Sequence, residues 1–154
     1  MQSSLVVVDS TDSHERLLAE AGQIAAGTGT PLVLLTRITE EEIAENAETL
    51  QAMSEAANTP LNSDSAREVA DRFAEEAADE AFAGLDGTVE YDVVSVVAEE
   101  DELADEVVRV AGERGCDHVY VAGRQRSPTG KALFGDTAQR LVLNFDGPVT
   151  VLTG

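Results

Sequence analysis

The sequence contains one cysteine, one lysine, no tryptophan and four prolines in 154 residues. With Cys116 alone, no intramolecular disulfide can form, so the cysteine count gives no sign of an oxidising compartment. No apolar run has the length of a signal peptide core or a membrane span, and no basic region precedes Leu5. We therefore expect a cytoplasmic protein with no membrane partner.

Acidic residues dominate the charge of the chain. Thirty Asp and Glu oppose ten Lys and Arg, giving a formal net charge of -20. A charge of this sign repels nucleic acid phosphates and anionic lipids, so we expect no nucleic-acid partner. Lys131 is the single lysine, and the composition resembles that of proteins from high-salt cytoplasms. We interpret the acidic residues as a solvated coat, whose self-repulsion is screened at molar salt because the Debye length falls to about 3 Å.

Five short apolar runs rich in β-branched residues predict strands. They cover Leu5 to Val8, Pro31 to Thr36, Val89 to Val97, His118 to Ala122 and Pro148 to Leu152. Because the runs are apolar almost throughout, they favour a parallel sheet that is covered on both faces.

Apolar residues at helical spacing lie between these runs. The first helix is expected to begin at Asp12, and another follows a capping box formed by Ser65 and Glu68. The four expected helix ends lie at or before Gly27, Gly84, Gly115 and Asp146. Strands that alternate with helices predict one α/β domain over residues 1–154, a doubly wound five-stranded parallel sheet in the order 3-2-1-4-5 with helices on both faces.

One segment, Glu40 to Asn62, does not fit this alternation. It begins with three glutamates and has only weak helical spacing of apolar residues. We interpret it as a surface helix or a mobile lid, with a functional segment as the alternative.

The candidate binding region follows from the topology. In a doubly wound sheet, ligands bind beyond the carboxyl ends of the strands where the winding reverses, which here is between the first and fourth predicted strands. The fourth strand is followed by residues 123–135, which contain no acid and hold Arg124, Arg126 and Lys131. A basic, glycine-containing turn before a helix is typical of a phosphate site. The alternative is that the glycines serve only the turn and the basic residues pair with the acidic surface.

Known catalytic and nucleotide-binding patterns do not account for this loop. Thr129-Gly130-Lys131 resembles the end of a P-loop, but Ala132 stands where a Ser or Thr must bind magnesium. No G-x-G-x-x-G follows the first predicted strand. Cys116 and His118 lack a third partner at metal-ligand spacing, so we predict no metal site and interpret Cys116 as a buried hydrophobe. We predict no catalytic residues and no enzyme activity.

Several of these stretches together resemble the universal stress protein A family. Leu5 to Thr11 is similar to its first strand and acidic loop, residues 119–130 and 133–139 to its fourth strand and signature loop, and residues 147–152 to its fifth strand. The resemblance implies the five-stranded fold and a homodimer, here through the strand Val149 to Leu152. It also implies adenine-nucleotide binding, since a subset of the family binds ATP.

The signature loop departs from the pattern of that subset, which reads Gly, two residues, Gly, nine residues, Gly, then Ser or Thr. The outer glycines match Gly123 and Gly135, but Arg126 replaces the middle one, the second spacer has eight residues and Asp136 replaces the Ser or Thr. Arg126 adds bulk where a phosphate would approach. Asp136 adds negative charge at a helix N-terminus. Thr137 is the nearest residue that can supply the missing hydroxyl.

By resemblance, the site has a nucleoside end and a phosphate end. Asp9 would contact the nucleoside, the backbone of Ala122, Gly123 and Gln125 would meet the ribose and first phosphate, and the start of the last helix would hold the outer phosphates. The full set of predicted site residues is Asp9, Ala122, Gly123, Gln125, Arg126, Lys131, Gly135, Asp136, Thr137 and Ala138.

The predicted function is a cytoplasmic, homodimeric stress-response protein that binds ATP or another adenine nucleotide. The alternative is a family member that has lost nucleotide binding and acts as a dimeric interaction protein. A phosphotransferase or ATPase is the weakest interpretation, because no general base or metal-binding acid pair is evident beside the loop.

Overall fold

Strands and helices alternate along the chain. The computed structural model describes residues 3–8, 13–41, 44, 64–85, 87–123 and 135–152. Its strands are β1 (Ser3–Val8), β2 (Leu32–Ile38), β3 (Tyr91–Val97), β4 (Cys116–Ala122) and β5 (Val149–Leu152). Its helices are α1 (Ser13–Thr28), α3 (Asp64–Phe82), α4 (Leu103–Arg114) and α5 (Gly135–Asn144), with a 3₁₀ turn, η1 (Glu100–Glu102), before α4.

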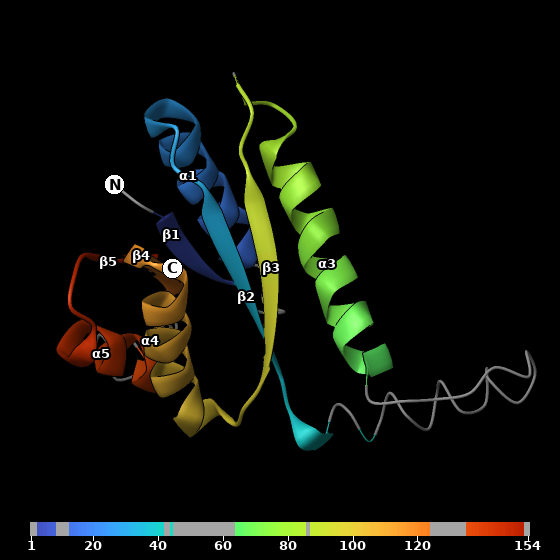
Figure 1. Ribbon diagram of the computed structural model, residues 1–154, viewed down its shortest axis with the longest axis vertical. Helices are drawn as coiled ribbons and strands as arrows, with labels where there is room; N and C mark the ends of the chain where they lie inside the picture. Colours follow the sequence, from blue (N-terminus) through green and yellow to red (C-terminus); the bar gives the residue numbers. More distant parts are fainter. Residues whose placement is uncertain are drawn as a thin grey trace, which may run out of the picture.

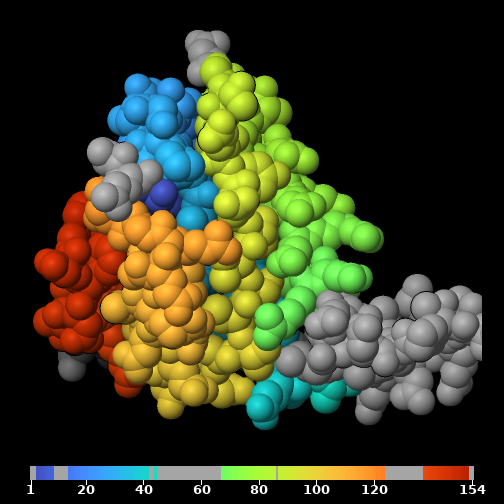
Figure 2. All heavy atoms as spheres, in the orientation of Figure 1, coloured from blue at the N-terminus to red at the C-terminus, as the bar shows by residue number. Residues whose placement is uncertain are grey.

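The strands form one parallel sheet in the order β3-β2-β1-β4-β5, which confirms the predicted topology. Figure 1 shows α4 and α5 together beside one face of the sheet and α3 beside the other. Helix α1 packs against α3 and β1. Figure 2 shows α5 and β5, in red, at one flank of the molecule and α3, in green, at the opposite flank. No helix in the described part of the chain has the length and apolar character to span a membrane.

Two apolar layers cover the two faces of the sheet. In β1, Leu5 and Val7 pack into the layer of α4 and α5, whereas Val6 and Val8 pack into the layer of α1 and α3. Successive side chains of a strand point to opposite faces, so a strand buried on both faces needs an apolar residue at every position. This requirement explains the almost uninterrupted apolar runs in the sequence.

Helix α1 ends later than predicted. It continues past Gly27 to Thr28, and Gly29 adopts a left-handed φ of 71°. The N–H of Gly29 donates to the carbonyl of Ala25 over 2.8 Å, closing the last turn. The predicted end at Gly27 is therefore wrong, because the left-handed residue that terminates the helix is the next glycine. The predicted surface helix or lid, Glu40 to Asn62, lies outside the described residues except for residues 40, 41 and 44.

A close approach joins α1 to α3. A Cβ atom on Gly22 would lie 2.5 Å from Cε1 of Phe82, so a larger residue here would require the ring to move. Phe82 in turn packs edge-on to Tyr91 of β3, with ring centroids 5.9 Å apart. The amino-terminal part of β3, the end of α3 and the middle of α1 therefore pack as one unit.

Candidate functional site

The two central strands lose their mutual pairing before they end. The register of β1 with β4 ends at Val6↔Tyr120. In contrast, β1 stays paired with β2 up to Val8↔Thr36, and β4 with β5 up to Ala122↔Leu152. Each central strand thus continues beyond the last β1–β4 pair, and we call this unpaired stretch between the two strands the β1–β4 gap. It lies at the carboxyl edge of the sheet, where the winding reverses, as the sequence predicts.

Ala122 and Gly123 direct their backbone groups to opposite sides. The N–H of Gly123 donates to the carbonyl of Leu152 over 2.8 Å, so it belongs to the sheet. Because consecutive residues of a parallel strand bond to opposite neighbours, the N–H and C=O of Ala122 face β1, beyond the last register pair. Of these two predicted contacts, Ala122 therefore presents its backbone to the gap, whereas the N–H of Gly123 is used within the sheet.

Helix α5 presents its N-terminus at the same edge. It begins at Gly135 and packs against α4 and β5. Ala138, only 1% exposed, anchors its first turn in the apolar layer that also contains Val121 of β4. The first N–H groups of a helix have no partner within it, and the helix dipole makes this end favourable for an anion. Thr137 is half-buried at this end of the helix.

Four of the remaining predicted site residues, Asp9, Gln125, Arg126 and Lys131, lie outside the described residues, and so does the side chain of Asp136. The structure therefore brings Ala122 of β4 and the start of α5 to one edge of the sheet, around the β1–β4 gap.

Two arginines of α4 are neutralised by carboxylates. Arg109 pairs with Glu106 and, over 3.1 Å, with Glu113 on the same helix. Arg114 pairs with Asp92 of β3 over 3.7 Å. These pairs are exposed, so each contributes little to stability, but they leave no positive charge unmatched on α4.

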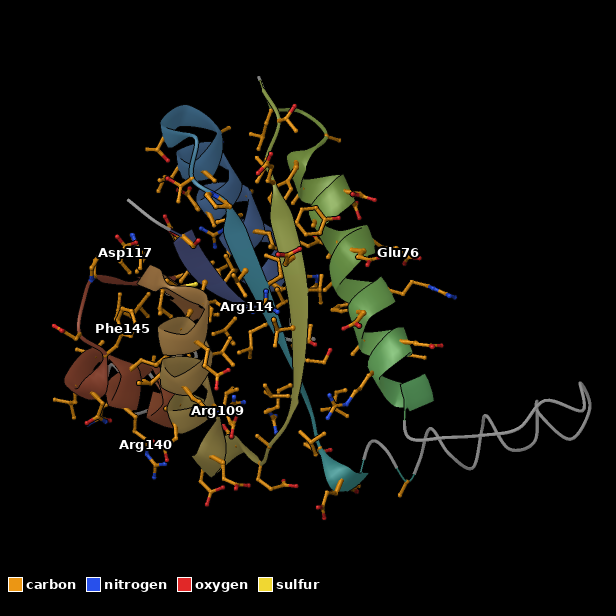
Figure 3. All side chains as sticks on the ribbon, viewed as in Figure 1. Glu76, Arg109, Arg114, Asp117, Arg140 and Phe145 are labelled. Atoms are coloured by element: carbon orange, nitrogen blue, oxygen red, sulfur yellow. The ribbon has the colours of Figure 1, made fainter. Side chains whose placement is uncertain are left out.

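Two other arginines donate to backbone carbonyls instead. Arg37 of β2 donates to the carbonyl of Ala98 over 3.4 Å, and Arg140 of α5 donates to the carbonyl of Asp101 in η1. Figure 3 shows Arg140 extending from α5 at the lower end of the view, where the carboxyl edge of the sheet lies. Both arginines therefore bring positive charge to the edge that carries the gap.

Titratable groups with shifted pKa values in β4 lie away from this edge. Burial raises the pKa of the Cys116 thiol to about 11, and Cys116 is a core residue, which confirms the interpretation as a buried hydrophobe. Burial lowers the pKa of His118 from its usual 6.5. The ring of His118 stacks on Tyr120, and its Nε2 lies 2.8 Å from Oγ1 of Thr150.

Arg37 is absent from the predicted site residues. The available signal was a charged side chain near the end of an otherwise apolar strand, Leu32–Ile38. Arg37 lies at the carboxyl edge of the sheet, one residue after the row Val8↔Thr36, and this position follows only from the strand register.

Comparisons with known proteins support the family resemblance. No curated protein sequence matches the chain. The universal stress protein from Archaeoglobus fulgidus is 23% identical, with a TM-score of 0.67 over 98% of each chain. A universal stress protein from Archaeoglobus fulgidus in complex with dAMP is 18% identical, with a TM-score of 0.62 over 98% of this chain and 97% of that one. A universal stress protein in complex with cAMP is 21% identical, with a TM-score of 0.61 over the same shares.

These likenesses establish the fold, and a match to the family model covers almost the whole sequence. Since the model of the universal stress protein family matches residues 1–153, the chain belongs to this family.

Proposed function

We propose that this protein binds an adenine nucleotide in the β1–β4 gap and acts as a nucleotide-dependent module in a stress response. The observation that carries this proposal is the loss of pairing between β1 and β4 beyond Val6↔Tyr120, which leaves the backbone of Ala122 facing the β1–β4 gap. Two structures with the same fold are complexes with dAMP and cAMP, which supports the choice of ligand class.

The phosphate end of the ligand would lie at the start of α5. The backbone N–H groups of the first turn would donate to phosphate oxygens, as helix N-termini commonly do. Asp136 opposes this contact, because a like charge 4 Å away costs about 1 kcal/mol in water and about 4 kcal/mol at a surface-like dielectric. Arg126 and Lys131 in the preceding loop supply charge that offsets this repulsion.

Titration calorimetry with ATP and with adenosine tests the proposal. The wild-type protein should bind both ligands, and Asp136→Ser should raise the affinity for ATP by about 5- to 1000-fold because it removes the repelling charge. The gain should be absent for adenosine, which has no phosphate. Lys131→Ala should lower the affinity for ATP, because it removes a positive charge near the phosphates. If the wild-type protein binds neither ligand, the nucleotide proposal is wrong.

We further propose a homodimer through β5. The carbonyls of Pro148 and Leu152 accept from β4, so the N–H groups of Val149 and Val151 point outward from the sheet. Residues 137–152 contain a single acid, Asp146, so two highly acidic copies can meet here with little repulsion. Light scattering in concentrated KCl should give the mass of a dimer, and a monomer would contradict this proposal.

The second candidate function is a dimeric interaction protein without nucleotide. Asp136 at the helix start favours it, and so does the apolar surface of α5, where Val142 is 54% and Leu143 is 75% exposed. A dimer that binds neither ATP nor adenosine would select this candidate over the first.

We assign no catalytic activity to the protein. The described groups of β4 with shifted pKa values, Cys116, His118 and Tyr120, are buried or half-buried, and none follows the last β1–β4 register pair. Release of phosphate from ATP by the purified wild-type protein, lost on Asp136→Ser or Lys131→Ala, would contradict this assignment.

A further inference from the structure

The outward backbone groups of β5 belong to two of its residues. The carbonyls of Pro148 and Leu152 accept hydrogen bonds from β4, so both residues face inward. Because consecutive residues of a parallel strand face alternate sides, Thr150 also faces β4, whereas Val149 and Val151 direct their N–H and C=O groups away from the sheet. Within the described part of the chain, these outward groups have no backbone partner. The edge therefore offers a second strand two donors and two acceptors.

The lack of charge in β5 favours a second copy of this chain as that strand. An interface with a two-fold axis brings each central residue against its own copy, so an acid there would meet an acid. The chain has thirty acids, but the sequence of β5 is Val-Thr-Val-Leu. A basic partner would instead be matched by acids along the edge. On the same flank, α5 adds the exposed apolar side chains of Val142 and Leu143 (Figure 2).

The positions of the outward groups determine how two copies of β5 can pair. In an antiparallel pair, each outward residue bonds to an outward residue of the other strand. When Val149 lies opposite Val151 of the partner subunit, all outward groups of both strands are used within the strand itself. A two-fold axis at Val149 or at Val151 would leave the other valine without a partner inside the strand. The register with the most hydrogen bonds therefore has its axis at Thr150.

We propose that β5 pairs antiparallel with β5 of a second copy and that the two-fold axis passes between Thr150 and Thr150 of the partner subunit. This inference rests on the proposed homodimer and adds its register. The two threonines then form a non-hydrogen-bonded pair, with Cα atoms about 4.5 Å apart.

This register extends a polar row that already exists within one copy. Nε2 of His118 lies 2.8 Å from Oγ1 of Thr150, and Thr150 is exposed. A hydroxyl has one donor and two acceptor sites, so it can bond to His118 and to a second hydroxyl at the same time. Threonine pairs across two strands stabilise sheets. The row then runs from His118 through both threonines to His118 of the partner subunit.

Disulfide formation by Thr150→Cys tests the register. Two cysteines with Cα atoms about 4.5 Å apart lie within the range that a disulfide spans. Val149→Cys and Val151→Cys are matched controls, because each residue lies diagonal to its own copy at about 7 to 8 Å, beyond that range. After mild oxidation in concentrated KCl, intact mass without reductant should show at least about tenfold more covalent dimer for Thr150→Cys than for either control. The wild type should show none, since Cys116 is buried.

The outcomes separate the register from the dimer itself. A wild type that is monomeric by light scattering would show that the proposed homodimer is wrong, and the register with it. If the wild type is a dimer and Val149→Cys or Val151→Cys cross-links best, only the register is wrong. A dimeric wild type with no cross-link in any of the three variants would show that the copies meet through another surface.

A pair of charge variants covers the case in which Thr150→Cys fails to fold. Because position 150 meets its own copy, Thr150→Asp and Thr150→Lys should each weaken the dimer by about 5- to 200-fold in about 0.15 M KCl. An equimolar mixture should restore a dimer that contains one copy of each variant, because opposite charges then meet. Sedimentation measures both effects. A mixture that is no more dimeric than either variant alone would overturn the register.

Discussion

The sheet ends in two edge strands that differ in how they are protected. At one edge, β3 has seven residues, includes Asp92 and is tied to α3 by side chains. Tyr91 donates to Asp79 over 3.1 Å, and Ser95 donates to Asp71 over 2.5 Å. A charge in the strand and a helix bound alongside it are both devices that discourage further strand pairing.

The other edge strand, β5, has none of these features. It has four residues, Val-Thr-Val-Leu, with no charge. Its side-chain hydrogen bond runs from Thr150 inward to His118 of β4, and its outer backbone groups have no partner in the described part of the chain. The comparison indicates that the same sheet closes one edge and leaves the other available for a second chain.

The largest expected effect comes from blocking the open edge. Val151→Pro removes an N–H that points outward and leaves the bonds between β4 and β5 in place, so the proposed dimer should dissociate to monomers while the fold is kept. The matched control is Val97→Pro, which removes an outward N–H from β3, since Ala98 is the residue that donates to β2. Sedimentation should show a monomer for the first variant and a dimer for the second. A dimer in both would contradict the assignment of β5.

The next effect concerns the turns that lead into the two edge strands, each of which contains a glycine with positive φ. Gly147, before β5, has a φ of 147°, and a Cβ there would lie 2.7 Å from the carbonyl oxygen of Asp117. Gly87, before β3, has a φ of 105° and open space around it. Gly147→Ala should therefore lower the free energy of unfolding by about 2 to 4 kcal/mol, and Gly87→Ala by about 1 to 2 kcal/mol. Urea denaturation measures the free energy of unfolding of both variants. Equal losses in the two would show that the structure around Gly147 shifts to remove the clash.

A smaller effect is expected from salt, and it bears on the difference in charge between the edges. Because the Debye length grows from about 3 Å at 1 M to about 30 Å at 0.01 M, dilution exposes the self-repulsion of a chain with a charge of -20. The melting temperature should fall by several degrees from molar to millimolar KCl, and the dimer should weaken. The acid-poor β5 edge should make the dimer less salt-sensitive than the fold. A melting temperature independent of KCl would contradict this expectation.

The smallest effect involves His118, which bonds to the open edge strand. Burial lowers its pKa in the folded protein, so the unfolded chain binds the proton more readily. Stability that is present above the usual pKa of 6.5 should therefore be lost as the pH falls towards the lowered value. The change should be small, since the side chain is partly exposed. Thermal melts between about pH 7.5 and 5.5 should show it in the wild type and not in His118→Gln, and identical profiles would exclude His118 as its source.

The sequence predicted the fold well because its signals are local. The apolar runs located all five strands, and their alternation with helical spacing predicted the strand order. Helix ends were less predictable, as Gly27 and Gly29 show: both residues can end a helix, and the choice depends on which of them closes the hydrogen bond to Ala25. The hydrogen bonds that close this end, including that from Thr28 to the carbonyl of Ile24, are known only from the folded helix.

The site was less predictable, because its geometry depends on register. The sequence located the edge of the sheet and the loop after β4, but it treated Ala122 and Gly123 alike. Their different roles follow from the bond between Gly123 and Leu152, which is distant in sequence. The position of Arg37 at the carboxyl edge was missed for a similar reason, since it depends on the row Val8↔Thr36.

The contact between Gly22 and Phe82 has a consequence for how relatives of this protein diverge. Since a methyl group at position 22 would collide with the ring where it now lies, we expect the two positions to change together. A relative with alanine at position 22 should carry a smaller residue than phenylalanine at position 82. In this chain, Gly22→Ala should lower the stability when made alone, and Phe82→Leu should restore part of the loss.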